Sequence, residues 1–169
     1  MLTIRREEER DRGSVFRVNE LAFGRPGEAQ LVDALRAGAQ PTISLVAEQE
    51  GRVVGHIFFS PVTIEWATET STGIGLAPLG VLPAMQRQGI GSQLVRAGLG
   101  ACRQIGQHAV VVLGHPEFYP KFGFVSASSF GLRCEYAVPD DVFMVAELTP
   151  GALAGRQGLV KYGPEFANL

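Results

Sequence analysis

The chain has 169 residues, which is within the usual size of one compact domain, about 100–200 residues, and long enough to bury a sizeable core. Its formal net charge is −2, with 46% hydrophobic and 19% charged residues, so a disordered or nucleic-acid-coating chain is excluded. The N-terminus becomes charged after four residues, and no segment approaches the ~18 uninterrupted apolar residues of a membrane span. We therefore expect a cytoplasmic protein with no nucleic-acid or membrane partner.

The two cysteines, Cys102 and Cys134, form no CxxC pair and belong to no His/Cys cluster that could hold zinc. The favoured interpretation is two reduced thiols that pack as small hydrophobic groups. We expect no metal site.

The first quarter of the chain predicts a short strand followed by two helices. The strand covers residues 2–5, and apolar residues spaced three and four apart predict a helix from Asp11 to about Phe23. A turn cluster of Gly, Arg and Pro follows at residues 24–27, and the same spacing predicts a second helix over residues 29–38.

A β-hairpin pattern follows the helices. Strands at residues 43–47 and 53–59 flank the tight turn Glu50-Gly51, so the sheet starts antiparallel. Residues 62–66 extend the hairpin or begin another strand, and the apolar run Ile74–Leu82 predicts a buried central strand.

The middle of the chain predicts a strand–helix–strand crossover. Small and apolar residues mark one face of a helix from Gly89 to Gly106, and Ala109–Leu113 reads as a second buried strand. Such a crossover is right-handed and makes Ile74–Leu82 and Ala109–Leu113 parallel. Pro78 cannot donate a ladder hydrogen bond, so it predicts a bulge or a local loss of pairing inside the first of these strands.

Signals weaken beyond Phe124, where residues 142–148 predict a strand and residues 131–137 a further one. No internal repeat or linker-like segment interrupts the chain. We therefore expect a mixed α/β fold in a single domain that covers residues 1–169.

The segment Gln86-Arg87-Gln88-Gly89-Ile90-Gly91 directly follows the buried strand and opens the amphipathic helix. Backbone N–H groups at a helix N-terminus suit a pyrophosphate, and glycines let the ligand approach closely. Glycines also open helices for plain turn reasons, so the context supplies the specificity. The patterns of a Walker loop and of a dinucleotide fingerprint are both missing from the sequence.

In this context the segment resembles the cofactor loop of the GNAT N-acetyltransferases, Gln/Arg-x-x-Gly-x-Gly/Ala, and the resemblance covers about residues 43–124. It implies a mixed sheet of about six to seven strands with flanking helices, in which the two central parallel strands splay around acetyl-CoA. No metal is implied. The cofactor-binding residues that the resemblance implies are Leu79, Gly80 and Val81 for the pantetheine arm, and Gln86, Arg87, Gln88, Gly89, Ile90, Gly91 and Ser92 for the pyrophosphate.

The segment Gly114–Phe124 looks like the family's Tyr-x-x-x-Gly-Phe signature, with Tyr119, Gly123 and Phe124 at its positions. The same stretch resembles the YhbS-like branch, in which a His-Pro-Glu element precedes the tyrosine. A short helix is expected at Pro116–Phe122. Tyr119 is the candidate general acid, because a phenol of ordinary pKa near 10 can protonate a departing thiolate. The alternative is an aromatic side chain that only packs this helix on the sheet.

The general base stays open, because Ile74–Leu82 lacks the glutamate that many GNAT relatives carry on this strand. His115 and Glu117 are the candidates, together with Glu65 or His56 acting through water. Each also has a structural interpretation, as a helix cap, a first-turn acid or a solvated strand charge.

Two further features have competing interpretations. Trp66 could line an acceptor cleft or cover the edge of the sheet, and packing is favoured. Asp140-Asp141 reads as a turn before a strand, although two carboxylates near a site could attract a cationic amine.

The resemblance implies an N-acetyltransferase that moves an acetyl group from acetyl-CoA to the amine of a small molecule or peptide by direct attack. The alternative is a non-catalytic acyl-CoA-binding sensor or partner module, which the missing strand glutamate favours. A tRNA acceptor would be expected to show a basic face, which the slight negative charge does not indicate. A homodimer is one expectation, since exposed C-terminal strands often let such domains pair, but the oligomeric state stays open.

Overall fold

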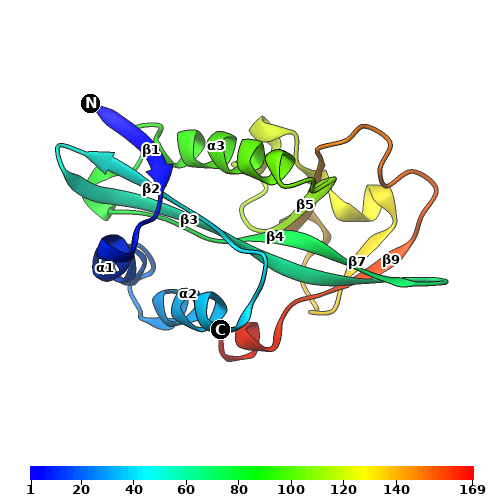
Figure 1. Ribbon diagram of the computed structural model, residues 1–169. Coiled ribbons are helices and arrows are strands. Elements are labelled where there is room, and N and C mark those ends of the chain that lie inside the picture. Colours follow the sequence, from blue (N-terminus) through cyan, green and yellow to red (C-terminus); the bar gives the residue numbers. More distant parts are fainter.

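The computed structural model describes residues 1–169, apart from the side chain of Asn168. Its strands form one mixed sheet with helices on both faces: α3 covers one face, and α1 and α2 cover the other (Figure 1). The helices are α1 Arg12–Phe23, α2 Gly27–Gly38 and α3 Ile90–Gln104. The strands are β1 Leu2–Arg6, β2 Ile43–Gln49, β3 Arg52–Trp66, β4 Thr70–Val81, β5 Ala109–Leu113, β6 Val125–Ser126, β7 Leu132–Cys134, β8 Phe143–Glu147 and β9 Gly158–Lys161.

The strand order is β1-β2-β3-β4-β5-β8-β6, and β9 pairs with the outer half of β3 and with β7. Only β4–β5 and β7–β9 are parallel pairs among the described strands. The predicted mixed α/β fold and the parallel crossover through α3 are confirmed. The nine strands exceed the six to seven expected, because β6 and β9 have only two and four residues and are not predicted from the sequence.

β4 and β5 separate soon after they meet. They pair only at Ile74–Leu76, opposite Val110–Val112. Against β3, Leu76 pairs with Phe59 and Leu79 with Ile57, so Ala77 and Pro78 together face the single residue Phe58. This extra residue is the bulge that Pro78 predicted, and it marks the point where β4 leaves its parallel neighbour.

α3 packs on the sheet through residues at helical spacing, among them Ile90, Leu94 and Leu99. The helix approaches β3 closely at Gly98, where an added Cβ would overlap the ring of Phe59. α1 and α2 cover the other face over Val46 and Phe58. The sheet therefore holds α3 and its N-terminus in a fixed position beside the end of β4.

Two local predictions need correction. The helix expected at Pro116–Phe122 is only a 3₁₀ turn, η3 Tyr119–Phe122, which ends where Gly123 adopts a φ of 95°. The prolines within and before this turn cannot donate the bonds of a longer helix. The strand expected at residues 131–137 covers only Leu132–Cys134.

Among the described helices, none has the length and apolar character that crossing a bilayer requires.

Candidate functional site

The loop before α3 presents backbone N–H groups to solvent. Gly89 is the N-cap residue of α3 with a φ of 85°, and Arg87 also has a positive φ, 64°. The first N–H groups of a helix have no partner within the helix. The Gln86 side chain donates from Nε2 to the Val81 carbonyl over 3.1 Å, which ties the loop to the end of β4.

A cavity of about 760 Å³ lies at this loop, between the end of β4, the start of α3 and the segment after β5; we call it the loop cavity. It brings together most of the predicted cofactor residues with two candidate catalytic residues and with two cationic side chains, Arg87 and Lys121. Its lining comprises Leu79, Val81, Met85, Gln86, Arg87, Gly89, Ile90, Gly91, Ser92, His115, Glu117, Phe118 and Lys121.

Two of the predicted cofactor residues do not line the loop cavity. Gly80 faces α1, where an added Cβ would lie 2.9 Å from Oδ1 of Asn19. Gln88 is exposed and lies outside the lining. Any contact of Gly80 with a ligand would therefore come from its backbone.

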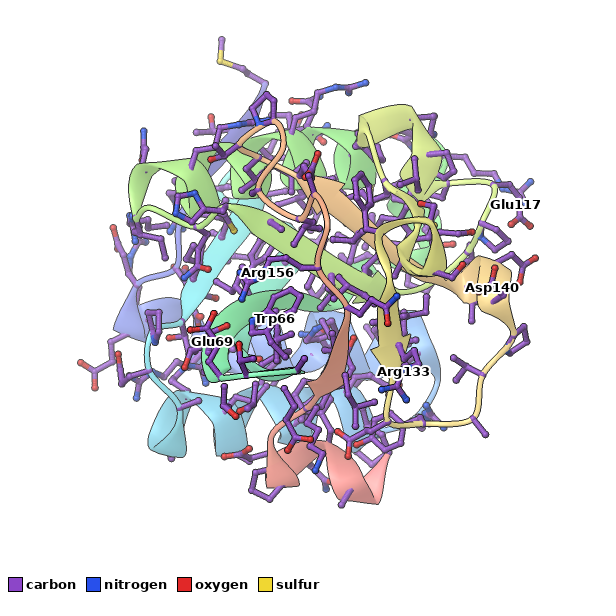
Figure 2. The ribbon with its side chains drawn as sticks, turned by 90° about the vertical axis from the view of Figure 1, so that its right-hand side faces the viewer. Trp66, Glu69, Glu117, Arg133, Asp140 and Arg156 are labelled. Atoms are coloured by element: carbon purple, nitrogen blue, oxygen red, sulfur yellow. The ribbon has the colours of Figure 1, made fainter. Side chains whose placement is uncertain are left out.

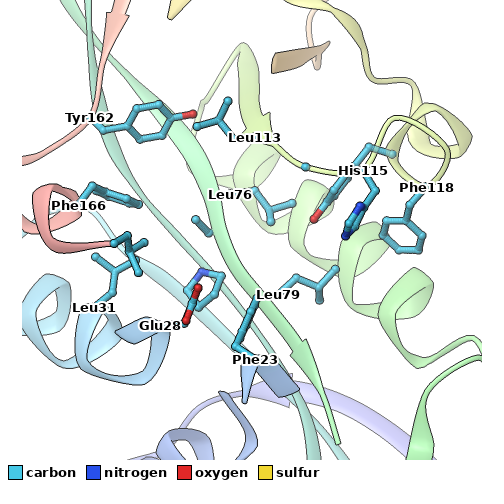
Figure 3. Close-up of a pocket in the computed structure, with 15 residues that line it drawn as sticks. Phe23, Glu28, Leu31, Leu76, Leu79, Leu113, His115, Phe118, Tyr162 and Phe166 are labelled. Atoms are coloured by element: carbon cyan, nitrogen blue, oxygen red, sulfur yellow. The ribbon is translucent and has the colours of Figure 1, made fainter. Parts of the chain in front are cut away.

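A second cavity of about 320 Å³ adjoins the first and shares Leu79, His115 and Phe118 with it; we call it the apolar cavity. It lies where β4 leaves β5 and is closed by α2 and by the C-terminal turn η6 Pro164–Asn168 (Figure 3). Its lining comprises Phe23, Glu28, Leu31, Leu76, Ala77, Pro78, Leu79, Leu113, Gly114, His115, Phe118, Tyr119, Tyr162, Phe166 and Leu169.

Tyr119 belongs to the lining of the apolar cavity, although only 7% of the residue is exposed. Its ring lies against Gly114 at the end of β5, so closely that a Cβ there would overlap it. Phe118 and Phe124 contact the ring edge to face, with centroids 5.0 and 5.5 Å away. Burial raises the pKa of Tyr119 to about 12, so its hydroxyl stays protonated at neutral pH.

The four candidate bases occupy different places. His115 is exposed at the junction of the two cavities, and Glu117 is exposed in the loop cavity. Glu65 lies outside both cavities, where it pairs with Nζ of Lys161 over 3.0 Å.

His56 is completely buried between β2 and α1, outside both cavities. Ser44 donates through Oγ to the Glu7 carboxylate, so the same Oγ accepts from Nε2 of His56, 2.8 Å away. Nδ1 then accepts from Nδ2 of Asn19, 3.0 Å away. Burial lowers the pKa of His56 to about 3, so the ring is neutral and holds α1 on the sheet.

Trp66 lies outside both cavities as well, and so do Asp140 and Asp141. The Trp66 ring is covered by the Arg156 guanidinium, 3.8 Å from its centroid, and Arg156 also pairs with Glu69 over 2.5 Å (Figure 2). Nε1 of Trp66 donates to Oγ of Ser71 over 2.7 Å. The packing interpretation of Trp66 therefore fits, and Asp140-Asp141 forms the turn η5 Asp140–Val142 before β8.

Sequence reasoning missed Glu28 and Tyr162, which both line the apolar cavity. Glu28 stands in the first turn of α2, where an acidic residue is expected for electrostatic reasons alone. Arg25 holds its carboxylate through two hydrogen bonds of 3.1 and 2.6 Å. The Tyr162 hydroxyl is buried and has no hydrogen-bond partner among the described residues.

The surroundings of both cysteines favour the protonated thiol. Cys102 is fully buried, and burial raises the pKa of its thiol to about 12. Burial raises the pKa of Cys134 as well. Within the described part of the chain, no three His, Cys, Asp or Glu residues form a group that could hold a metal ion.

Comparison with known proteins identifies close relatives. A family model described as an acetyltransferase (GNAT) domain matches residues 3–127. The uncharacterized N-acetyltransferase YhbS of Escherichia coli strain K12 is 40% identical over 146 residues, which cover 86% of this chain and 86% of the relative.

Two solved structures share the fold over almost the whole chain. The GNAT family N-acetyltransferase YhbS from Escherichia coli in complex with CoA matches with a TM-score of 0.88 and 36% identity, over 98% of this chain and 91% of that one. A GNAT family acetyltransferase from Brucella melitensis in complex with acetyl-CoA matches with a TM-score of 0.78 and 36% identity, over 98% of both chains.

Proposed function

The chain belongs to the GNAT family of N-acetyltransferases, and from this premise we propose that it transfers the acetyl group of acetyl-CoA to the amine of a small molecule or peptide by direct attack. The observation that supports the proposal most is that the two cavities adjoin each other at the divergence of β4 and β5. A donor bound in the loop cavity and an acceptor bound in the apolar cavity would meet beside Leu79, His115 and Phe118.

The residues of the loop cavity fit a CoA pyrophosphate. The start of α3 offers unpaired N–H groups and the positive end of its dipole, and Arg87 and Lys121 add two positive charges. No atom lies within 4 Å of a Cβ added at Gly89, so a side chain there would enter the space that the anion needs. Acetyl-CoA, when bound, supplies an acyl group activated as a thioester.

The pantetheine arm would run along the part of β4 that has left β5. The side chains of Leu79 and Val81 line the loop cavity, and the backbone of Gly80 lies between them. A backbone N–H of this segment would polarise the thioester carbonyl, because a fixed donor stabilises the charge that develops on the oxygen. The loop residues Gln86–Ser92 would hold the pyrophosphate.

We assign Tyr119 as the general acid that protonates the departing thiolate. Its raised pKa keeps the proton available at neutral pH. Burial in the site also raises the pKa of the departing CoA thiol. The pKa difference between the Tyr119 phenol and this thiol therefore does not widen, and proton transfer to the thiolate becomes no harder. For removal of the proton from the amine, His115 is better placed than Glu117, because His115 lines both cavities.

The experiment is calorimetric titration of the purified protein with acetyl-CoA. Gly89→Asp places a carboxylate where the pyrophosphate would lie and is expected to abolish binding. Gly106→Asp is the matched control, because Gly106 follows the other end of the same helix, has the same φ of 85° and also has open space around it. Absence of binding by the wild type would contradict every acyl-CoA-dependent function.

A non-catalytic acyl-CoA-binding module is the second candidate, which the lack of an acidic residue in Ile74–Leu82 favours. The two functions differ in turnover. An enzyme releases free CoA when acetyl-CoA is mixed with a panel of amines, and Tyr119→Phe slows that release. A binding module would bind acetyl-CoA equally well and release none.

A further inference from the structure

The lining of the apolar cavity has few polar groups. Eleven of its fifteen residues have no polar atom in the side chain, and the other four are Glu28, His115, Tyr119 and Tyr162. Of these four, Glu28 alone carries a formal charge when histidine is neutral. A ligand that fills this space must therefore be largely apolar, with polar groups only where these four side chains can meet them.

The polar groups stand on opposite walls. Figure 3 shows Glu28 and Tyr162 entering from the side of α2 and the C-terminal segment, and His115 and Phe118 entering from the segment after β5. The wall with His115 and Tyr119 adjoins the loop cavity, where the acyl group would lie. Glu28 is on the far wall, so it faces the end of an acceptor that does not react.

The environment of Glu28 suits it to bind a cation. Only 8% of its side chain is exposed, whereas the side chain of its partner Arg25 is 60% exposed and lies outside the cavity lining. Water therefore screens the charge of Arg25 more than that of the carboxylate. The two bonds from Arg25 also fix the carboxylate in one orientation, and each oxygen can still accept a second hydrogen bond.

The Tyr162 side chain lines the same wall, and its hydroxyl has no partner among the described residues. Its ring is held by stacking on Tyr136, with centroids 5.9 Å apart, and by Phe166, 5.1 Å away. The hydroxyl is buried without a partner, and leaving such a group unpaired is costly. The Tyr162 hydroxyl is therefore a separate polar group, and Glu28 is the group on this wall that carries a charge.

We propose that the acceptor is a small amine with two ends: a reacting amine at the His115–Tyr119 wall, an apolar body, and a second cationic group bound by Glu28. This inference rests on the proposed acetyltransferase function and names its substrate class. Diamines with an aliphatic body are the simplest members of that class. A monoamine offers no cation to the cavity side of Glu28, and an amino acid with a terminal carboxylate is repelled by it.

The test is a matched set of acceptors with the same five-carbon body: cadaverine, pentylamine and δ-aminovalerate. Release of CoA gives kcat/KM for each acceptor. A charge-assisted bond at Glu28 should make cadaverine about 10- to 100-fold better than pentylamine, and δ-aminovalerate the poorest. Titration of CoA-saturated protein with cadaverine gives its affinity without turnover and should show the same preference over pentylamine.

Variants assign the preference to Glu28. Glu28→Gln should bring cadaverine down to the level of pentylamine while acetyl-CoA affinity is unchanged. Asp33→Asn is the matched control, because it removes one negative charge from an exposed position of the same helix and should leave the preference intact. Arg25→Gln removes the competing cation without touching the cavity and should keep or increase the preference.

Failure of this inference is distinguishable from failure of the proposed function. If the wild type binds acetyl-CoA and acetylates pentylamine with the same kcat/KM as cadaverine, the acceptor needs no second cationic group. The proposed acetyltransferase function is then still supported. If Glu28→Gln retains the preference, Glu28 is not the binding group. If the wild type does not bind acetyl-CoA, both the proposed function and the proposed acceptor class are wrong.

Discussion

At the scale of single residues, Tyr119 combines burial with access to the apolar cavity. We predict that Tyr119→Phe lowers kcat by roughly 100-fold or more, the usual contribution of a general acid, and leaves acetyl-CoA affinity unchanged. Steady-state kinetics and calorimetry measure the two effects separately. Tyr136→Phe, which removes a more exposed tyrosine hydroxyl outside both cavities, serves as the control. An unchanged kcat in Tyr119→Phe would leave the tyrosine with a packing role only.

The buried His56 is expected to make the free energy of unfolding depend on pH in the acid range. Its pKa is lowered from an ordinary value of 6.5 to about 3, so the folded state favours the neutral ring. The resulting stability is fully present above pH 6.5 and is lost as the pH falls toward 3, by at most about 1.4 kcal/mol per pH unit. Urea unfolding at intervals from about pH 7 to about pH 5 measures this slope.

The comparison for His56 is His56→Gln. This variant is expected to be less stable at neutral pH, because Gln does not reproduce both ring hydrogen bonds, but its stability should depend less on pH in the same window. Equal slopes in the two proteins would show that another group causes the acid dependence. The Asp11 carboxyl contributes only at lower pH, since Arg5 lowers its pKa to about 2.

The position of Glu28 in the apolar cavity could not be predicted from its local sequence. Its position in the first turn of α2 predicts an acid that only stabilises the helix. Its exposure and its place in the cavity depend on how α2 lies against β4 and the C-terminal segment, and no local pattern encodes that arrangement. The loop with Gly89 and Gly91 could be predicted, because the strand before it and the helix after it have clear sequence patterns. Most of the predicted loop residues line one cavity.

At the scale of elements, α3 positions the loop because it packs closely on the sheet. Gly98 has no room for a side chain, since an added Cβ would overlap Phe59, whereas Gly100 on the same helix has no atom within 4 Å of an added Cβ. We predict that Gly98→Ala destabilises the fold by about 1–3 kcal/mol through overpacking. Gly100→Ala should instead stabilise it by about 0.4–1 kcal/mol, because alanine favours the helix.

Urea denaturation of the two variants provides the measurement. Because both changes are Gly→Ala in one helix, the difference between them isolates packing from helix propensity. Should Gly98→Ala be as stable as Gly100→Ala, the contact between α3 and β3 would be looser than the structure indicates, and α3 could shift relative to β4.

The sequence predicts an element well where its apolar pattern is long, or where a residue such as proline restricts the backbone. α3 and β5 are strongly patterned, and Pro78 predicted a bulge or a local loss of pairing at the place where β4 has its extra residue. The helix expected at Pro116–Phe122 is only the turn η3, because Pro120 cannot donate the hydrogen bond of a longer helix. β6 and β9 have two and four residues, and strands that short are specified by their neighbours in the sheet.

At the scale of the whole molecule, the two cavities meet where the parallel strands part. α3 closes one side, α1 and α2 cover the other face, and the C-terminal turn lies against α2 (Figure 1). The apolar cavity therefore depends on segments that are far apart in the sequence. This explains why most of the lining of the loop cavity could be predicted from residues 79–92, whereas the lining of the apolar cavity could not.

The same geometry predicts how the cofactor affects stability. A CoA molecule in the loop cavity would contact β4, α3 and the segment after β5 together, so it binds the folded chain and not the unfolded one. At a CoA concentration about 100 times its Kd, the folded state gains about 2.7 kcal/mol, which corresponds to a rise in Tm of about 5–11 °C for a domain of this size. Thermal unfolding followed by circular dichroism measures the rise. Tyr119→Phe should keep it and Gly89→Asp should lose it, because the first removes only a proton donor and the second fills the anion site. A rise that survived Gly89→Asp would place CoA elsewhere on the molecule.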